Sequence, residues 1–188
     1  AAITLLIAVL AVYEVLDSVS MEDNVEISAH RGASLVAPEN TLSAVRQAVA
    51  QGATYVEVDV QRTSDGVVVV AHDADLMRVG RQPFVISKST LEKLRKVDVG
   101  SHFAPEFAGE HLPSLAEVID EVRGRAKLIV ELKSYSADPE ALVLAVVRIL
   151  KTNDFLDEAV IMSLEYRETQ MVRRLDPELE VGFTTSAA

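Results

Sequence analysis

The chain of 188 residues contains no cysteine and no tryptophan, and it has only four tyrosines and five phenylalanines. Without cysteine, disulfide bonds, thiolate catalysis and zinc sites built on cysteine are excluded. Because aromatic side chains are scarce, aliphatic side chains must fill the core. The length suits one domain of ordinary size, with enough chain to bury a core.

Positive charge is also in short supply, since 18 lysines and arginines face 29 acidic residues and the net charge is -11. A broad basic surface for nucleic acid is therefore not expected, and we predict no nucleic-acid partner. The overall field would repel an anionic substrate. A phosphate site would consequently need local cations, either a metal ion or an arginine or lysine side chain.

The start of the chain is almost wholly apolar, since residues 1–12 read AAITLLIAVLAV; the first residue is not methionine. Twelve residues are too few to span a bilayer, which takes about 20. A basic region is missing as well, so the segment is a poor signal peptide. We expect residues 1–20 to hold the end of a transmembrane helix and a linker. The alternative is an apolar helix packed on the domain that follows at 21–188.

Short apolar runs alternate with helical patterns along the rest of the chain. Strands are predicted at 27–30, 55–60, 67–72, 127–133, 159–164 and 180–185. Helices are predicted at 38–50, 90–97, 138–150 and 165–175, and a capping box of Ser114 and Glu117 opens another. An irregular insert occupies about 74–113.

This alternation predicts a parallel sheet with helices outside. A closed (β/α)8 (TIM) barrel has eight strands and typically about 250 residues. We therefore expect a (β/α)8 barrel truncated here to about six strands, with the seventh and eighth strands missing. Open sheet edges tend to aggregate or to pair with other chains, so the 188-residue piece alone should be poorly stable and weakly active.

Side-chain alternation places polar groups on one face of several predicted strands. In 55–60 the valines share one face, while Glu57 and Asp59 share the other. In 127–133 the aliphatic residues likewise face away from Glu131 and Lys133. His30 and His72 stand at the ends of two further strands. The carboxyl ends of barrel strands are where such enzymes keep their sites, so we expect these groups to converge.

The converging groups suggest a particular chemistry. Three carboxylates without cysteine indicate a hard divalent cation, Mg2+ or Ca2+, held by oxygen. The alternative is an inward salt-bridge network with Lys133, but one lysine cannot neutralise three acids. Two histidines at strand ends suit general acid and base work near neutral pH.

Several ordered motifs resemble those of the glycerophosphodiester phosphodiesterase family. They cover about 26–185, and they include His30-Arg31-Gly32, Pro38-Glu39-Asn40-Thr41, Val56-Glu57-Val58-Asp59-Val60, Thr63-x-Asp65-Gly66, His72-Asp73, Leu76-x-Arg78, Pro113-Ser114-Leu115 and Glu131-Leu132-Lys133. The apolar start resembles the membrane-anchored bacterial branch, in which a multi-helix membrane domain precedes the catalytic barrel. That branch would place the protein at a bacterial cell membrane, on an unknown side.

The resemblance implies a barrel of the phospholipase C-like phosphodiesterase type that hydrolyses glycerophosphodiesters to glycerol 3-phosphate and an alcohol. It implies that the insert at 74–113 shapes the leaving-group pocket. The implied roles are a divalent cation on Glu57, Asp59 and Glu131, an acid–base pair of His30 and His72, and phosphate binding by Arg31 and Lys133.

Two other functions remain as alternatives. One is a related barrel phospholipase of the phosphoinositide or sphingomyelinase D type, which shares the barrel and the metal chemistry. The other is a non-catalytic binding domain associated with a membrane. The loss of a histidine or of a metal ligand would have favoured the second alternative, but all of these residues are present.

Overall fold

The computed structural model describes residues 25–136 and 138–185. The apolar segment at 1–12, on which the expectation of a transmembrane helix depends, lies outside the described residues. Of the helices within the described residues, none has both the length and the apolar character needed to cross a membrane.

Strands and helices alternate through the described residues much as the sequence predicts. In chain order they are β1 (Ser28–Ala29), α2 (Leu42–Ala50), β2 (Tyr55–Arg62), β3 (Val68–Val70), α3 (Met77–Gly80), the 3-10 helix η1 (Ile86–Lys88), α4 (Leu91–Leu94), the 3-10 helix η2 (Pro105–Phe107), α5 (Leu115–Val122), β4 (Lys127–Leu132), α6 (Pro139–Thr152), β5 (Ala159–Ser163), α7 (Tyr166–Leu175) and β6 (Glu180–Phe183).

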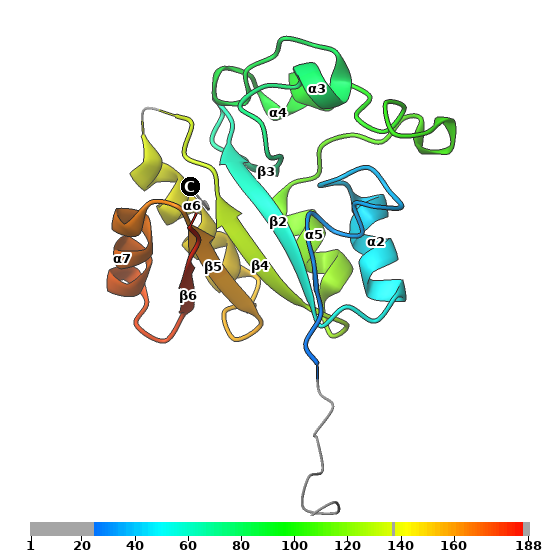
Figure 1. Ribbon diagram of the computed structural model, residues 1–188. Coiled ribbons are helices and arrows are strands. Elements are labelled where there is room, and N and C mark those ends of the chain that lie inside the picture. The colour runs from blue at the N-terminus through cyan, green and yellow to red at the C-terminus, as the bar shows by residue number, and fades with distance from the viewer. Residues whose placement is uncertain (1–24, 137, 186–188) are drawn as a thin grey trace, which may run out of the picture.

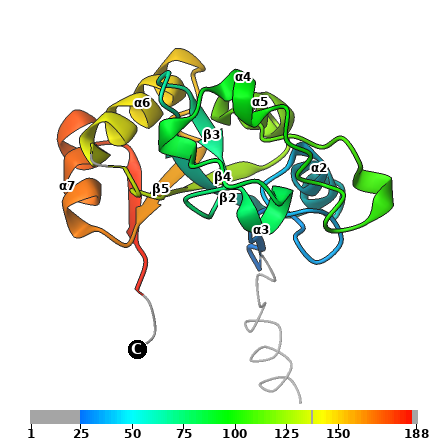
Figure 2. The same ribbon diagram turned by 90° about the horizontal axis from the view of Figure 1, so that it is seen from above.

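Five of the six strands in the described part of the chain run parallel in the order β1-β2-β4-β5-β6. Figure 1 shows these strands side by side, with the loops of the insert above them. Seen from above, α2, α5, α6 and α7 form an arc around the outer face of the curved sheet (Figure 2). This layout is that of part of a (β/α)8 barrel, as predicted.

The third strand corrects the expectation that all six strands are parallel barrel strands. β3 pairs antiparallel with β2, with Val60 opposite Val70 and Arg62 opposite Val68. The five residues between the two strands, 63–67, are too few for a parallel crossover, which needs a dozen or more. The Asp65-Gly66 turn therefore makes a hairpin, and β3 runs back along β2 in the opposite direction.

Helix α2 begins later than predicted. Asn40 has a positive φ of 58° and interrupts the helix expected from residue 38. Thr41 is the N-cap, and its hydroxyl accepts a hydrogen bond from the amide of Ala44, so α2 begins at Leu42. The predicted capping box of Ser114 and Glu117 is confirmed at the start of α5.

The insert at 74–113 contains more structure than the one helix predicted at 90–97. It holds two short α-helices and two 3-10 helices, and Thr90 caps the shorter-than-expected α4. Its buried aliphatic residues pack with Val69 and Ala71 into a small core that is separate from the main core between sheet and helices. The insert is therefore a packed layer over the strand ends rather than a loose loop.

Candidate functional site

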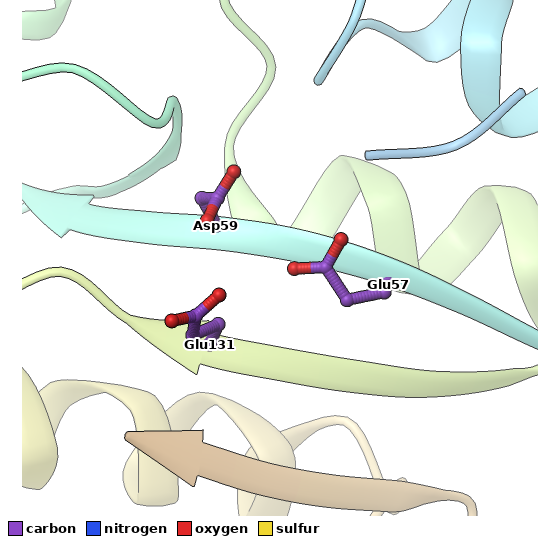
Figure 3. Close-up of side chains that lie close together, drawn as sticks. All are labelled: Glu57, Asp59 and Glu131. Carbon is purple, nitrogen blue, oxygen red and sulfur yellow. The ribbon is translucent and has the colours of Figure 1, made fainter. Parts of the chain in front are cut away.

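Three carboxylates meet on the inner face of the sheet, as the alternation of side chains predicts. Glu57 and Asp59 come from β2, Glu131 comes from β4, and the register sets Asp59 opposite Glu131. Figure 3 shows the three side chains on the same side of the two strands. One oxygen from each carboxylate lies within 4.8 Å of the others. Asp59 is fully buried and Glu57 is almost so.

Two cationic side chains contact this cluster. Lys133 Nζ lies 2.8 Å from Glu131 Oε1 and 3.2 Å from Asp59 Oδ1, and Arg31 Nε lies 3.3 Å from Asp59 Oδ2. Burial works against the charge of Lys133, but the hydrogen bond with Glu131 and the charge of Asp59 hold its pKa above the usual value. The cationic side chains of Lys133 and Arg31 thus form ion pairs with Asp59 and Glu131 but not with Glu57.

Glu57 is the least compensated acid of the cluster. Within the described residues its one ion-pair contact is with His30, whose Nε2 lies 4.0 Å from Oε2. Burial and then the charge of Asp59 raise the pKa of Glu57 to about 7. Its Oε1 is buried without a hydrogen bond, and Asp59 Oδ1 also lacks one despite its proximity to Lys133.

These properties fit a hard divalent cation. Buried oxygens without hydrogen bonds and acids that repel one another are stabilised by a positive ion, and Mg2+ and Ca2+ prefer carboxylate oxygen. The alternative of a salt-bridge network with Lys133 describes Asp59 and Glu131. It does not account for Glu57, which lies outside the contacts of Lys133.

The β1–α2 loop brings His30 and Arg31 to the cluster. The backbone amide of Arg31 donates a hydrogen bond of 2.7 Å to Glu57 Oε2, with Arg31 at a positive φ of 56°. Gly32 follows at φ 74°, where an added Cβ would lie 2.7 Å from Ala44. This tight turn leaves the side chain of His30 largely exposed beside Glu57.

His72 arrives by a different route. Because β3 runs antiparallel to β2, the chain returns toward Asp59, whose carbonyl accepts a hydrogen bond from the amide of Ala71 at 2.9 Å. The side-chain contact of His72 is with Asp73, at 2.8 Å, and lies outside the carboxylate cluster. Three parallel strands therefore bring their polar groups to the cluster, whereas the hairpin places His72 beside Asp73. Within the described residues no hydrogen bond or ion pair joins His72 to the three carboxylates, so its convergence with them stays a prediction.

Two residues of this region were not among the predicted site residues. Gln61 donates to the carbonyls of Ala71 and Asp73 at 2.9 and 2.7 Å, and so holds the segment that carries His72. Because Gln61 lies two residues after Asp59 on the same strand, side-chain alternation predicts that it also points inward. Asn40 donates to Asp59 Oδ2 at 2.8 Å, and its oxygen accepts from the amide of Asp59 at 3.2 Å. No strand pattern predicts that contact, because it depends on the loop conformation.

Comparison with known sequences shows the family. A sequence model described as the glycerophosphoryl diester phosphodiesterase family matches residues 30–188. A glycerophosphodiester phosphodiesterase of Caldanaerobacter subterraneus subsp. tengcongensis is 35% identical over 161 residues, which is 83% of this chain and 65% of the relative. A protein of Bacillus subtilis named as a putative glycerophosphodiester phosphodiesterase is 35% identical over 159 residues, 85% and 65% of the two chains.

Solved structures show the same fold. A phosphodiesterase of Oleispira antarctica, in complex with the product sn-glycerol-3-phosphate, superposes with a TM-score of 0.81 at 34% identity, over 87% of this chain and 67% of that one. A glycerophosphodiester phosphodiesterase of Agrobacterium tumefaciens gives 0.76 at 30% identity, over 84% and 65%. The chain thus spans about two thirds of the length of these relatives.

Proposed function

This chain belongs to the glycerophosphoryl diester phosphodiesterase family, and on that premise we propose that it hydrolyses glycerophosphodiesters to glycerol 3-phosphate and an alcohol. The observation that carries the proposal is the cluster of Glu57, Asp59 and Glu131, in which the buried Glu57 and Asp59 each have one oxygen without a hydrogen bond that a cation would satisfy. The product found in the Oleispira antarctica relative supports the class of substrate.

We assign a divalent cation, Mg2+ or Ca2+, to these three carboxylates. Bound there, such an ion supplies positive charge that polarises a phosphoryl oxygen. Arg31 and Lys133 then stabilise the negative charge that grows on the phosphoryl group, since both already lie against the cluster. Their charges also counter the repulsion that a protein of net charge -11 exerts on a phosphodiester.

His30 and His72 are proposed as the pair that moves protons. One removes a proton from the nucleophile, which is either water or a hydroxyl group of the substrate whose cyclic phosphate product water then opens, and the other donates a proton to the leaving alcohol. Their surroundings differ, because His30 is exposed beside Glu57 whereas His72 is half-buried and bonded to Asp73. Which of them acts as the acid is open to experiment through the pH dependence of single variants.

The direct test is a panel of glycerophosphodiesters with each metal ion. The complete protein is purified and assayed for release of glycerol 3-phosphate from glycerophosphocholine and glycerophosphoethanolamine after chelation and after addition of Mg2+, Ca2+ or Mn2+. We expect turnover that chelation abolishes and that His30→Ala and His72→Ala each lower by about 100- to 10,000-fold. Absence of turnover with every ion, or full activity of His30→Ala, contradicts the proposal.

Intact lipids in the same panel separate the alternatives. Hydrolysis of phosphoinositides or sphingomyelin in preference to glycerophosphodiesters would indicate the related phospholipases. Binding of a divalent cation without any hydrolysis would indicate a binding domain.

A location at a bacterial cell membrane is a separate proposal, supported by the apolar residues 1–12 alone. Fractionation of cells that express the protein with and without these residues tests it. Recovery of both forms in the same fraction would contradict a membrane role for the segment.

A further inference from the structure

A series of ion pairs joins the loop that carries Arg31 to the loop that carries His72. Glu39 Oε1 accepts a hydrogen bond of 2.9 Å from Arg31 Nη1. Both oxygens of Glu39 also accept from the guanidinium of Arg78, each at 2.8 Å. Arg78 belongs to the insert, so Glu39 connects two segments that are far apart in the sequence.

The series continues to the imidazole of His72. Arg78 Nε donates to Asp73 Oδ2 at 2.7 Å, and Asp73 Oδ1 lies 2.8 Å from His72 Nδ1. Both oxygens of Asp73 are therefore engaged, one by each neighbour. The guanidinium of Arg78 donates to Glu39 on one side and to Asp73 on another, and these hydrogen bonds fix the orientation of the Asp73 carboxylate.

The protonation of Asp73 determines the tautomer of His72. Burial of Asp73 opposes its charge, but hydrogen bonds from Arg78 and His72 hold its pKa below the usual value. An ionised carboxylate only accepts hydrogen bonds, so Nδ1 of His72 must carry a proton and donate it. The other nitrogen, Nε2, is then the atom that gains and loses a proton.

The backbone of the same segment is also held. Gln61 donates from β2 to the carbonyls of Ala71 and Asp73, on either side of His72. With the main chain fixed by Gln61 and Nδ1 fixed by Asp73, the imidazole ring has one orientation. A general acid or base needs such control because proton transfer depends on short, aligned hydrogen bonds.

We propose that Asp73 is a positioning residue that keeps the proton of neutral His72 on Nδ1, and that Arg78 and Glu39 tie this pair to Arg31. The phosphate-binding and proton-transfer groups are then set as one unit. This inference rests on the proposed roles of His72 and Arg31 in phosphodiester hydrolysis. It adds Asp73, Arg78 and Glu39 to the residues on which that reaction depends.

The first experiment measures the tautomer directly, without any turnover. In protein labelled with 15N-histidine, neutral His72 should show the chemical shifts of the Nδ1–H form, assigned by their loss in His72→Ala. Asp73→Asn should convert it to the Nε2–H form. Since Arg78 Nε must face an oxygen, the amide nitrogen of the new Asn turns toward His72 Nδ1 and forces that atom to accept.

The matched control is Asp75→Asn, in the same loop. Asp75 accepts a hydrogen bond from the amide of Met77, and within the described residues no hydrogen bond or ion pair joins it to His72. It should leave the tautomer and the kinetics unchanged. A predominant Nε2–H form in the unmodified protein, or the same tautomer in both asparagine variants, would overturn the proposal. A protein that showed the expected tautomers but hydrolysed nothing would remove the proposed function and leave the positioning intact.

The second experiment is kinetic. Asp73→Asn should lower kcat by about 10- to 100-fold, which is less than removal of His72 itself, with little change in KM. Arg78→Lys keeps the positive charge but cannot bridge Glu39 and Asp73, so it should lower kcat by several-fold, about 3- to 10-fold. It provides an independent test if Asp73→Asn does not fold. A kcat for Arg78→Lys equal to that of Asp75→Asn would refute the link.

Discussion

The two faces of β2 are built from alternate residues of one strand, yet they obey opposite physical rules. On the outer face Val56, Val58 and Val60 are fully buried against the helices. On the inner face Glu57, Asp59 and Gln61 are nearly as buried, but their neighbours are polar and charged. Successive side chains point to opposite sides of a strand, so residues one step apart have entirely different surroundings.

Burial has a different consequence on each face. Burial of each valine side chain on the outer face stabilises the folded state by about 1.5–3 kcal/mol. On the inner face burial opposes the charge of each carboxylate. Lys133, Arg31 and Asn40 contact Asp59, whereas burial raises the pKa of Glu57 to about 7. The comparison teaches that stability resides on the outer face, while the inner face gives up stability to hold a charged site.

The largest expected effect is on catalysis when a carboxylate of the inner face is neutralised. Glu57→Gln should lower kcat/KM for glycerophosphocholine by about 1,000-fold, because cation binding is weakened and a bound cation contributes several kcal/mol. The fold should be retained or stabilised, since an uncompensated buried charge is removed. Steady-state kinetics and thermal unfolding check the two parts.

The control for that substitution is Glu92→Gln, which neutralises an exposed acid paired with Lys96 in the insert. It should change neither kinetics nor unfolding temperature appreciably. If Glu57→Gln retained more than a tenth of the activity, the proposal that the inner face of β2 serves catalysis would be contradicted.

The next largest expected effect is a loss of stability when a buried side chain of the outer face is truncated. Leu128 of β4 is fully buried on that face, beside the valines of β2. Leu128→Ala should cost about 2–5 kcal/mol of unfolding free energy, because it removes buried methyl groups and leaves a cavity. Activity per folded molecule should change little. Urea unfolding followed by circular dichroism measures the loss.

Leu144→Ala is the matched control, because the side chain of Leu144 on α6 is about half exposed. Its cost should stay within about 0.5 kcal/mol. Equal costs for the two leucines would show that the outer face is not where stability resides.

The smallest expected effect is a pH dependence of stability that belongs to the inner face of the metal-free protein. The pKa of Glu57 is raised from 4.5 to about 7, so the folded state holds a proton that the unfolded state releases. Stability should therefore fall as the pH rises from about 4.5 to 7, by up to about 3 kcal/mol, and then level off. Urea unfolding at a series of pH values measures it.

Glu57→Gln supplies the control, because it removes the titrating group and should flatten this part of the curve. Addition of Mg2+ or Ca2+ should also restore stability above pH 7 in the unmodified protein but not in the variant. Identical pH curves for the two proteins would mean that Glu57 is not the group that titrates.

Much of the site follows from local rules. The alternation of Val56-Glu57-Val58-Asp59-Val60 predicts which side chains face inward, and the same rule places Glu131 with them. The same rule applies to Gln61, which lies one residue beyond the predicted strand 55–60 but within β2. Asn40 and the Glu39–Arg78 pair could not be predicted, since they join loops whose conformations no periodic pattern specifies.

The sequence by itself determined the alternating strands and helices, the inward face of β2 and β4, and the family motifs. These depend on residues close together in the chain, whose periodicity is fixed by backbone geometry. Only the tertiary structure decided that β3 turns back as a hairpin, and that Glu39 bonds to Arg31 and Arg78 together. Such contacts join distant segments, so they exist only once the helices and the insert have packed around the sheet.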